Sequence, residues 1–204
     1  MKKKTIVASV LLGVLLIGIV TAGLVPYLSN MVSGNVVVDG PVFYLNGLIG
    51  GVYHELLINE IPEDEEIVNW NDGQRVVFET EPLGVNGFYK AKFDVHIWAK
   101  TNNSDGPSNN TLMQLDIIKI DGSGKQTQIC DPMIVNLSKY YDTFRERKTS
   151  CSSTDTISLN PEDKFGLRAH GITSNEMQEY WISTGKGYGP DDDRYSRIEV
   201  TSAT

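Results

Sequence analysis

A long run of alternating side chains at residues 87–100, GFYKAKFDVHIWAK, constrains the fold of this chain more than any other feature. The odd-numbered side chains from Tyr89 to Ala99 are apolar or small, and the even-numbered ones from Lys90 to Lys100 are mostly charged. A β-strand places successive side chains on opposite faces, whereas the period of a helix would mix the two sets. The run therefore predicts a half-buried β-strand with one face in the core.

Shorter segments of the same kind recur along the chain, separated by Gly- and Asp-rich turns. KFGLRAHG at residues 164–171 alternates in the same way, and TLMQLDIIKI at 111–120 changes phase after Ile117, which predicts a bulge or a change of sheet. LSKYYDTFRER at 137–147 predicts one short helix. Many short strands with so little helix predict an all-β fold, a jelly-roll β-sandwich formed as a single domain by residues 34–204.

The length and charge of the chain limit its partners. At 204 residues it is long enough for one domain with a proper core and short for two. Its formal net charge is −8. Nucleic acid and anionic lipid surfaces both attract basic proteins, so this charge predicts no nucleic-acid partner and membrane contact only through a hydrophobic segment.

The first residues predict export. Met1 is followed by three lysines and then by an uncharged apolar run from Thr5 to Val25. Small residues near its end offer a cleavage site after Ala22, so residues 1–22 are predicted to be a signal peptide. The alternative is an uncleaved anchor, because the run is long enough to span a bilayer. In both cases the rest of the chain is expected to be extracellular or exposed at the cell surface.

Two cysteines, Cys130 and Cys151, lie in the part expected to be exported. We predict that they form one structural disulfide, since neither CxxC spacing nor neighbouring histidines suggest a redox or metal site. Three Asn-x-Ser/Thr sequons, at Asn102, Asn109 and Asn136, are candidate N-glycosylation sites. The first two flank SDGPSN, whose composition predicts an exposed loop.

Catalytic and metal-binding motifs are not evident. His54, His96 and His170 share no ligand spacing, and His54-Glu55 lacks the second histidine of a zinc-protease helix. The nucleophile elbow of serine hydrolases, GxSxG, is missing as well. The acidic run at residues 191–193 is interpreted as solvated charge, with a calcium ligand set as the alternative. We therefore expect no enzyme activity, no cofactor and no metal site.

The positive signal is the stretch YLSNMVSGNVVVDGPVFYL, residues 27–45, which follows directly on the apolar run. It resembles the start of mature TasA/camelysin-type proteins, secreted jelly-roll subunits of bacterial matrix fibres, and of the related archaeal bundling pili and threads. The residues that carry the resemblance are Tyr27, Leu28, Ser29 and Asn30, followed by Ser33, Gly34 and Asn35 ahead of a first strand.

The resemblance implies that the mature N-terminal segment, residues 23–33, completes the sheet of the next subunit by strand addition. Such a contact is head to tail and produces an open homopolymer rather than a closed ring. The apolar side chains implied to enter the neighbouring groove are Leu24, Val25, Tyr27, Leu28, Met31 and Val32. The alternatives are that this segment pairs within its own domain or serves as a tether.

Two functions from different classes follow from these observations. The first is a structural subunit of an extracellular filament, whose partner is a second copy of the chain. The second is a cell-surface jelly-roll binding module for glycan or calcium-dependent adhesion, for which Trp98, on a polar strand face, is the most suggestive residue.

Overall fold

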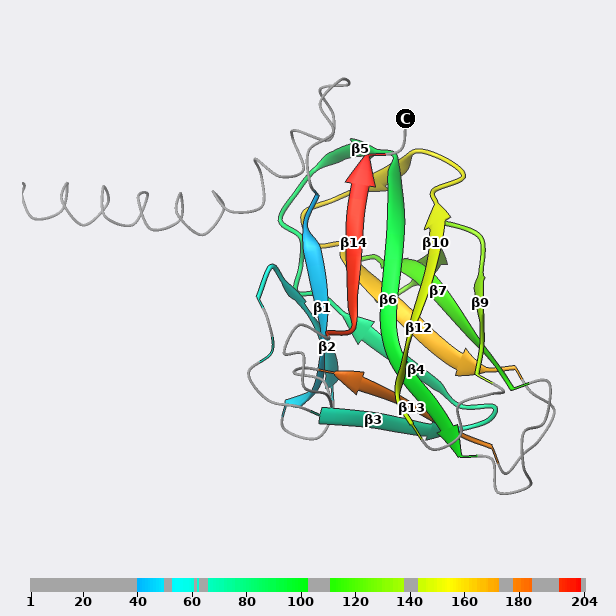
Figure 1. Ribbon diagram of the computed structural model, residues 1–204. Coiled ribbons are helices and arrows are strands. Elements are labelled where there is room, and N and C mark those ends of the chain that lie inside the picture. The colour runs from blue at the N-terminus through cyan, green and yellow to red at the C-terminus, as the bar shows by residue number, and fades with distance from the viewer. Residues whose placement is uncertain are drawn as a thin grey trace, which may run out of the picture.

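The computed structural model describes residues 40–49, 53–60, 62, 66–102, 111–137, 143–172, 178–184 and 195–202. Within these ranges the chain consists of strands and their connections (Figure 1), and no helix there is long and apolar enough to cross a membrane. The strands, in chain order, are β1 (Val42–Ile49), β2 (Tyr53–Ile58), β3 (Glu66–Asn71), β4 (Arg75–Glu79), β5 (Gly87–Tyr89), β6 (Ala91–Asn102), β7 (Leu112–Ile120), β8 (Gln126–Gln128), β9 (Met133–Asn136), β10 (Arg145–Ser152), β11 (Ile157–Leu159), β12 (Lys164–Gly171), β13 (Glu179–Thr184) and β14 (Arg197–Ser202).

Twelve of these strands form one continuous sheet that folds back on itself. Its order is β3-β13-β6-β14-β1-β2-β4-β12-β7-β8, with β10 paired to β6 and β9 paired to β7. The remaining two strands, β5 and β11, form a small antiparallel sheet. Figure 1 shows β1, β14, β6 and β10 running side by side, with β7 and β12 crossing behind them. The two halves are therefore the layers of a sandwich.

One hydrophobic core fills the space between the layers. Phe165 of β12 meets Phe43 of β1 and Phe93 of β6 edge to face, with ring centroids 6.1 and 5.9 Å apart. Towards β3 and β13, Trp70 stacks on Tyr180 with centroids 5.9 Å apart. Burying each side chain of this size stabilises the fold by about 1.5–3 kcal/mol. The predicted all-β sandwich is confirmed, and its architecture is jelly-roll-like.

The alternation that predicted the longest strand is confirmed in β6. Phe93, Val95 and Ile97 are buried in the core, while Asp94 and His96 on the other face are half-buried. The long strand can serve three neighbours, because β14 and β13 pair with it in succession while β10 pairs along its other side. This single strand therefore organises the first layer.

The burial pattern of β7 does change phase after Ile117, but the bulge or change of sheet predicted there is wrong. β7 pairs with β12 in one unbroken register from Met113 to Ile120, without a bulge. Ile117 faces the core, and Asp116 and Ile118, on the opposite face of the same strand, are fully buried too. A strand buried on both faces loses its clean hydrophobic alternation, and in the sequence this loss looks like a change of phase.

The helix predicted at 137–147 is also wrong where the structure describes it. Residues 145–147 begin β10, which pairs with β6 through to Ser152. Phe144, which suggested a helical apolar face, instead lies under the ammonium group of Lys100. Pairing with a long neighbouring strand overrides a weak local helical pattern.

Several predictions concern parts of the chain outside the described residues. These are the signal peptide or anchor at 1–22, the segment at 23–33, the start of the domain at residue 34 and the acidic run at 191–193. They stay predictions.

A buried ion pair links β7 to β12 on the outer face of the second layer. The side chain of Asp116 is 0% exposed and that of Arg168 is 19% exposed. Oδ2 of Asp116 accepts hydrogen bonds from Nε and Nη2 of Arg168 at 3.0 and 2.8 Å, and Oδ1 accepts one from Gln114 at 2.7 Å. These charge-assisted bonds offset the loss of water around a fully buried carboxylate.

The folded protein is expected to lose stability in acid because of His54. Its ring lies 5.1 Å from that of Phe78, and burial lowers the pKa of His54 below its usual value. The unfolded chain therefore takes up a proton that the folded chain excludes, so stability is complete above about pH 6.5 and falls as the pH drops towards the folded pKa. His170 adds to this loss, because burial lowers its pKa as well.

Replacing His54 by phenylalanine (H54F) should reduce the difference in stability between about pH 8 and about pH 5.5. Urea unfolding followed by circular dichroism measures this difference. Phenylalanine keeps the aromatic contact with Phe78 and removes the proton site. A variant that loses as much stability in acid as the wild type would show that His54 does not contribute.

Candidate functional site

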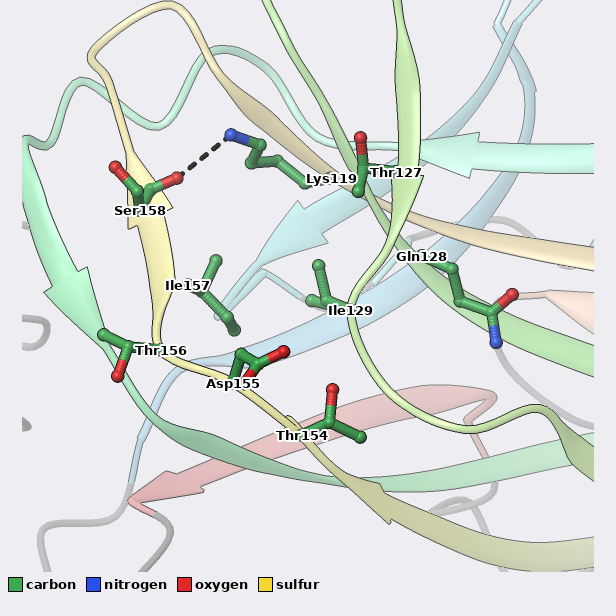
Figure 2. Close-up of a pocket in the computed structure, with 9 residues that line it drawn as sticks. All are labelled: Lys119, Thr127, Gln128, Ile129, Thr154, Asp155, Thr156, Ile157 and Ser158. Carbon is green, nitrogen blue, oxygen red and sulfur yellow. Dashed lines mark hydrogen bonds between the residues drawn. The ribbon is translucent and has the colours of Figure 1, made fainter.

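An open cleft of about 220 Å³ lies between the end of β8 and the segment that leads into β11 (Figure 2). One wall runs from Thr127 to Ile129 and the other from Thr154 to Ser158, with Lys119 of β7 also lining it. The cleft is smaller than the roughly 300–1,000 Å³ typical of pockets for drug-sized ligands. One wall is the end of β8 in the large sheet, and the other leads into β11 of the small sheet.

A tight turn positions the β7–β8 wall. The carboxylate of Asp121 accepts hydrogen bonds from the N–H groups of Ser123 and Lys125 at 2.9 and 3.0 Å, and Gly124 has a φ of +83°. The hydroxyl of Ser123 and these N–H groups lower the pKa of Asp121 below its usual range. The sequence DGSG thus fixes the hairpin locally and keeps β8 in register with β7.

One edge of β8 has no neighbouring strand in the described part of the chain. β8 ends the sheet order and pairs only with β7. The N–H of Ile129 bonds to the carbonyl of Ile117 at 3.0 Å, so the odd-numbered residues of this wall face β7. The alternation of an antiparallel ladder then directs the main-chain groups of Gln126 and Gln128 to the other edge.

The two walls meet at a disulfide. Cys130 is bonded to Cys151, as predicted, and an isolated antiparallel bridge pairs Cys130 with Ser153. Beyond this bridge the two segments of the chain diverge. The cleft is the gap that this leaves between them. With a sequence separation of 21 residues, the disulfide stabilises the fold by about 3 kcal/mol in the chain-entropy model. Such a bond also indicates an oxidising compartment.

Lys119 reaches across the cleft from the β7 side, as Figure 2 shows. Its Nζ donates a hydrogen bond to the carbonyl oxygen of Ser158 at 3.0 Å and lies 3.4 Å from Oδ2 of Asp163. Asp163 is buried, so the ammonium charge is balanced inside the protein. The carbonyl of Ser158 accepts a side-chain donor here, which means that this edge of β11 faces the cleft rather than its partner strand β5.

The arrangement can accept an extended, uncharged chain. Ile129 and Ile157 give the cleft an apolar surface, three threonines add hydroxyl groups, and Asp155 is exposed. Main-chain groups along the free edge of β8 can pair with an added strand, while apolar side chains of that strand contact the two isoleucines. A charged segment would fit less well, because burying an unpaired charge is costly.

The other residues singled out from the sequence do not gather at the cleft. Asn102 ends β6 and Asn136 ends β9, whereas Asn109 lies outside the described residues. Asn136 is exposed, as a glycan acceptor must be. The residues predicted to be donated to a neighbouring copy lie outside the described residues: Leu24, Val25, Tyr27, Leu28, Met31 and Val32.

The three histidines lie on different strands. His54, His96 and His170 belong to β2, β6 and β12, and the part of the chain that the structure describes holds no group of three or more His, Cys, Asp or Glu residues placed to bind a metal ion. His96 instead contacts Glu146, with Nδ1 3.2 Å from Oε1. It ties β6 to the edge strand β10.

Trp98 lies half-buried on the outer face of the first layer. In register it stands opposite Glu146 of β10 and Ser183 of β13. On the same face, Nζ of Lys100 is 4.8 Å from the ring centre of Phe144 and 5.2 Å from that of Trp181. Aromatic rings therefore do collect on this face, but a lysine already covers two of them.

Sequence reasoning did not identify the cleft. Alternating side chains predict strands, but they carry no information on how two strands diverge in space. One available signal was the composition of β8, Gln-Thr-Gln, all of it exposed. A strand with no buried side chain is typical of a sheet edge.

No family model and no curated protein match this chain. Among solved structures, a CocE/NonD family hydrolase from Staphylococcus aureus is similar with a TM-score of 0.53 at 12% identity, over 81% of this chain and 37% of the hydrolase. An α-amino acid ester hydrolase is similar with a TM-score of 0.52 at 12% identity, over 81% of this chain and 36% of that protein.

These similarities define the class of fold. At 12% identity they show a shared β-sandwich and nothing about chemistry. The chain spans little more than a third of the length of those proteins, at 37% and 36%. It is a jelly-roll-like β-sandwich domain with one internal disulfide, and no family follows from the comparison.

Proposed function

We propose that this chain is a non-catalytic structural subunit of an extracellular filament, in which residues 23–33 of one copy add a strand to the next copy. The observation that carries the proposal is the cleft beside β8, where a strand edge lacks a neighbour within the described residues. Main-chain groups of Gln126 and Gln128 supply affinity, and contacts with Ile129 and Ile157 set the register.

The proposed donor segment matches the chemistry of the cleft. The side chains of residues 23–33, GLVPYLSNMVS, carry no charge, so the only ionised group of the segment is the α-amino group that cleavage creates at Gly23. In an extended chain alternate side chains share a face, which places Tyr27 with Met31 and Leu28 with Val32. Either face can offer apolar side chains to the two isoleucines of the cleft.

The proposed location is extracellular or at the cell surface. The disulfide supports this location, because such bonds persist in oxidising compartments. The resemblance of residues 27–45 to TasA/camelysin-type subunits supports the role in a fibre. A donated segment makes a head-to-tail contact, which repeats without closing and so extends into a filament.

Insertion of the segment into the cleft of its own chain is the competing arrangement. β1 is separated from β10 by β14 and β6, three strand spacings or roughly 14 Å. Residues 34–41, which connect the segment to β1, span at most about 29 Å. The chain is thus long enough for either arrangement, and a decisive experiment must distinguish donation between copies from self-insertion.

A cell-surface binding module is the second candidate. The observation that favours it is the outer face of the first layer, where Trp98 and Trp181 lie on neighbouring strands. Half-buried aromatic rings of this kind can stack on sugar rings. Two results together would favour this candidate over the filament. The chain would form no fibre, and it would bind neutral oligosaccharides saturably with that binding lost in W98A.

Electron microscopy of two purified chains tests the filament proposal. The first contains residues 23–204 and the second lacks residues 23–33. Fibres from the first chain that disappear in the second, with the β-sheet circular dichroism signal unchanged, are expected. Folded monomers of both chains across a wide concentration range would contradict the proposal.

A further inference from the structure

The disulfide has a position that matters beyond stability. Cys130 directly follows Ile129 of one wall of the cleft, and Cys151 lies just before Thr154 of the other. The walls belong to different ladders, since β8 pairs with β7 whereas the segment 154–158 leads into β11, which pairs with β5. The Cys130–Cys151 bond therefore sets the spacing of two elements whose strands do not pair with each other.

The other connections across the cleft are weak by comparison. The isolated bridge between Cys130 and Ser153 is a single β-bridge pair. The contact from Lys119 to the carbonyl of Ser158 depends on a flexible side chain that is 20% exposed. Its ammonium group also lies 3.4 Å from Oδ2 of the buried Asp163, but the link to the carbonyl of Ser158 is a single non-covalent contact. Without the disulfide, only these non-covalent contacts set the spacing of the two walls across the cleft.

The surrounding fold does not depend on this bond in the same way. β8 retains its ladder with β7, and β10 retains eight paired positions along β6 from Arg145 to Ser152. Ile129 remains bonded to Ile117, and Ser153 remains bonded to Ala91. Reduction is thus expected to alter the cleft more than the sandwich.

We infer that the cleft is a redox-gated acceptor, which binds residues 23–33 of another copy only when Cys130 and Cys151 are joined. This inference rests on the proposed filament function and adds its regulation. Closing the gate converts two thiols into one disulfide and releases two protons and two electrons. A disulfide-bearing oxidant accepts them by thiol–disulfide exchange and is itself reduced to a dithiol.

The gate has a direct consequence for the timing of assembly. Thiols stay reduced in the cytosol and are oxidised in exported proteins. A subunit held in the reduced form would carry the donor segment but would lack a formed acceptor. Assembly would then begin only after export, and premature fibres inside the cell would be avoided.

Sedimentation of the mature chain, residues 23–204, tests the gate. The fraction of protein that pellets is measured for the oxidised chain, for the chain reduced with a phosphine, and for the double variant C130S/C151S. We expect at least a tenfold smaller pelleted fraction in the last two. Hydrogen exchange should show the N–H groups of Ile129 and Ser153 still protected, because their ladders persist.

A destabilised control separates the gate from a loss of overall stability. Val68 is buried in β3, at the opposite end of the sheet order from β8, and V68A lowers stability without touching the cleft. This variant should pellet like the wild type. Equal pelleting of oxidised and reduced chains would overturn the gate and leave the filament proposal standing. Failure of the oxidised chain to pellet would overturn both.

Discussion

Replacing Arg168 by alanine (R168A) is expected to lower the free energy of unfolding by about 3–5 kcal/mol, because it leaves a buried carboxylate without its charge partner. Asp116 is 0% exposed and keeps only the hydrogen bond from Gln114 in this variant. The reverse change, D116A, should cost less, since the side chain of Arg168 is already 19% exposed and can turn towards water. Urea unfolding at neutral pH measures both values.

The asymmetry between the two variants is the informative result. A double variant, R168M/D116L, removes both charges and should recover much of the loss, because an apolar pair of similar volume tolerates burial. Equal and small losses in both single variants would show that water reaches Asp116 in solution. The ion pair would then have no structural role between β7 and β12.

Replacing Gln128 by proline (Q128P) is expected to reduce fibre formation about tenfold or more, which corresponds to roughly 1.4 kcal/mol of binding free energy. Proline removes the main-chain N–H that faces the cleft and places its ring where an added strand would pair. The domain itself should stay folded, since proline is tolerated on an edge strand where the N–H points away from its neighbour. The pelleted fraction of the mature chain provides the measurement.

The matched control for this variant is Q128A. It loses the same side chain, including the hydrogen bond from Nε2 to the carbonyl of Cys130 at 2.8 Å, but retains the main-chain N–H. Fibres from Q128A and few from Q128P are expected. If Q128P assembles as well as Q128A, the free edge of β8 is not the acceptor.

The strands of this fold could be predicted because burial is one-sided along most of them. In β6 the inward and outward positions differ in polarity at nearly every step, so the sequence alone indicated the strand and its buried face. The buried face of β7 could not be identified in this way, because Asp116 and Ile118 are buried on the face expected to be exposed. Asp116 can be buried because it is paired with Arg168, which lies on another strand far along the chain.

The candidate site was predictable only in part. Cys130 and Cys151 could be paired, because two cysteines in a chain predicted to be exported leave a single choice. The cleft beside them depends on the point at which two backbones diverge, and no side-chain pattern encodes that. The role of Lys119 at the cleft was not predictable either, because its hydrogen bond to Ser158 joins strands of two different sheets.

Photo-crosslinking in mixed fibres tests the central claim most directly. An unlabelled mature chain carrying a photoreactive phenylalanine derivative at Leu28 is mixed with a ¹⁵N-labelled wild-type chain, assembled, irradiated and analysed by mass spectrometry. The account predicts crosslinks from the unlabelled donor peptide to labelled peptides containing residues 127–129 or 154–158. Crosslinks confined to unlabelled pairs would show that each segment fills its own cleft, and crosslinks elsewhere would show that the cleft is not the acceptor.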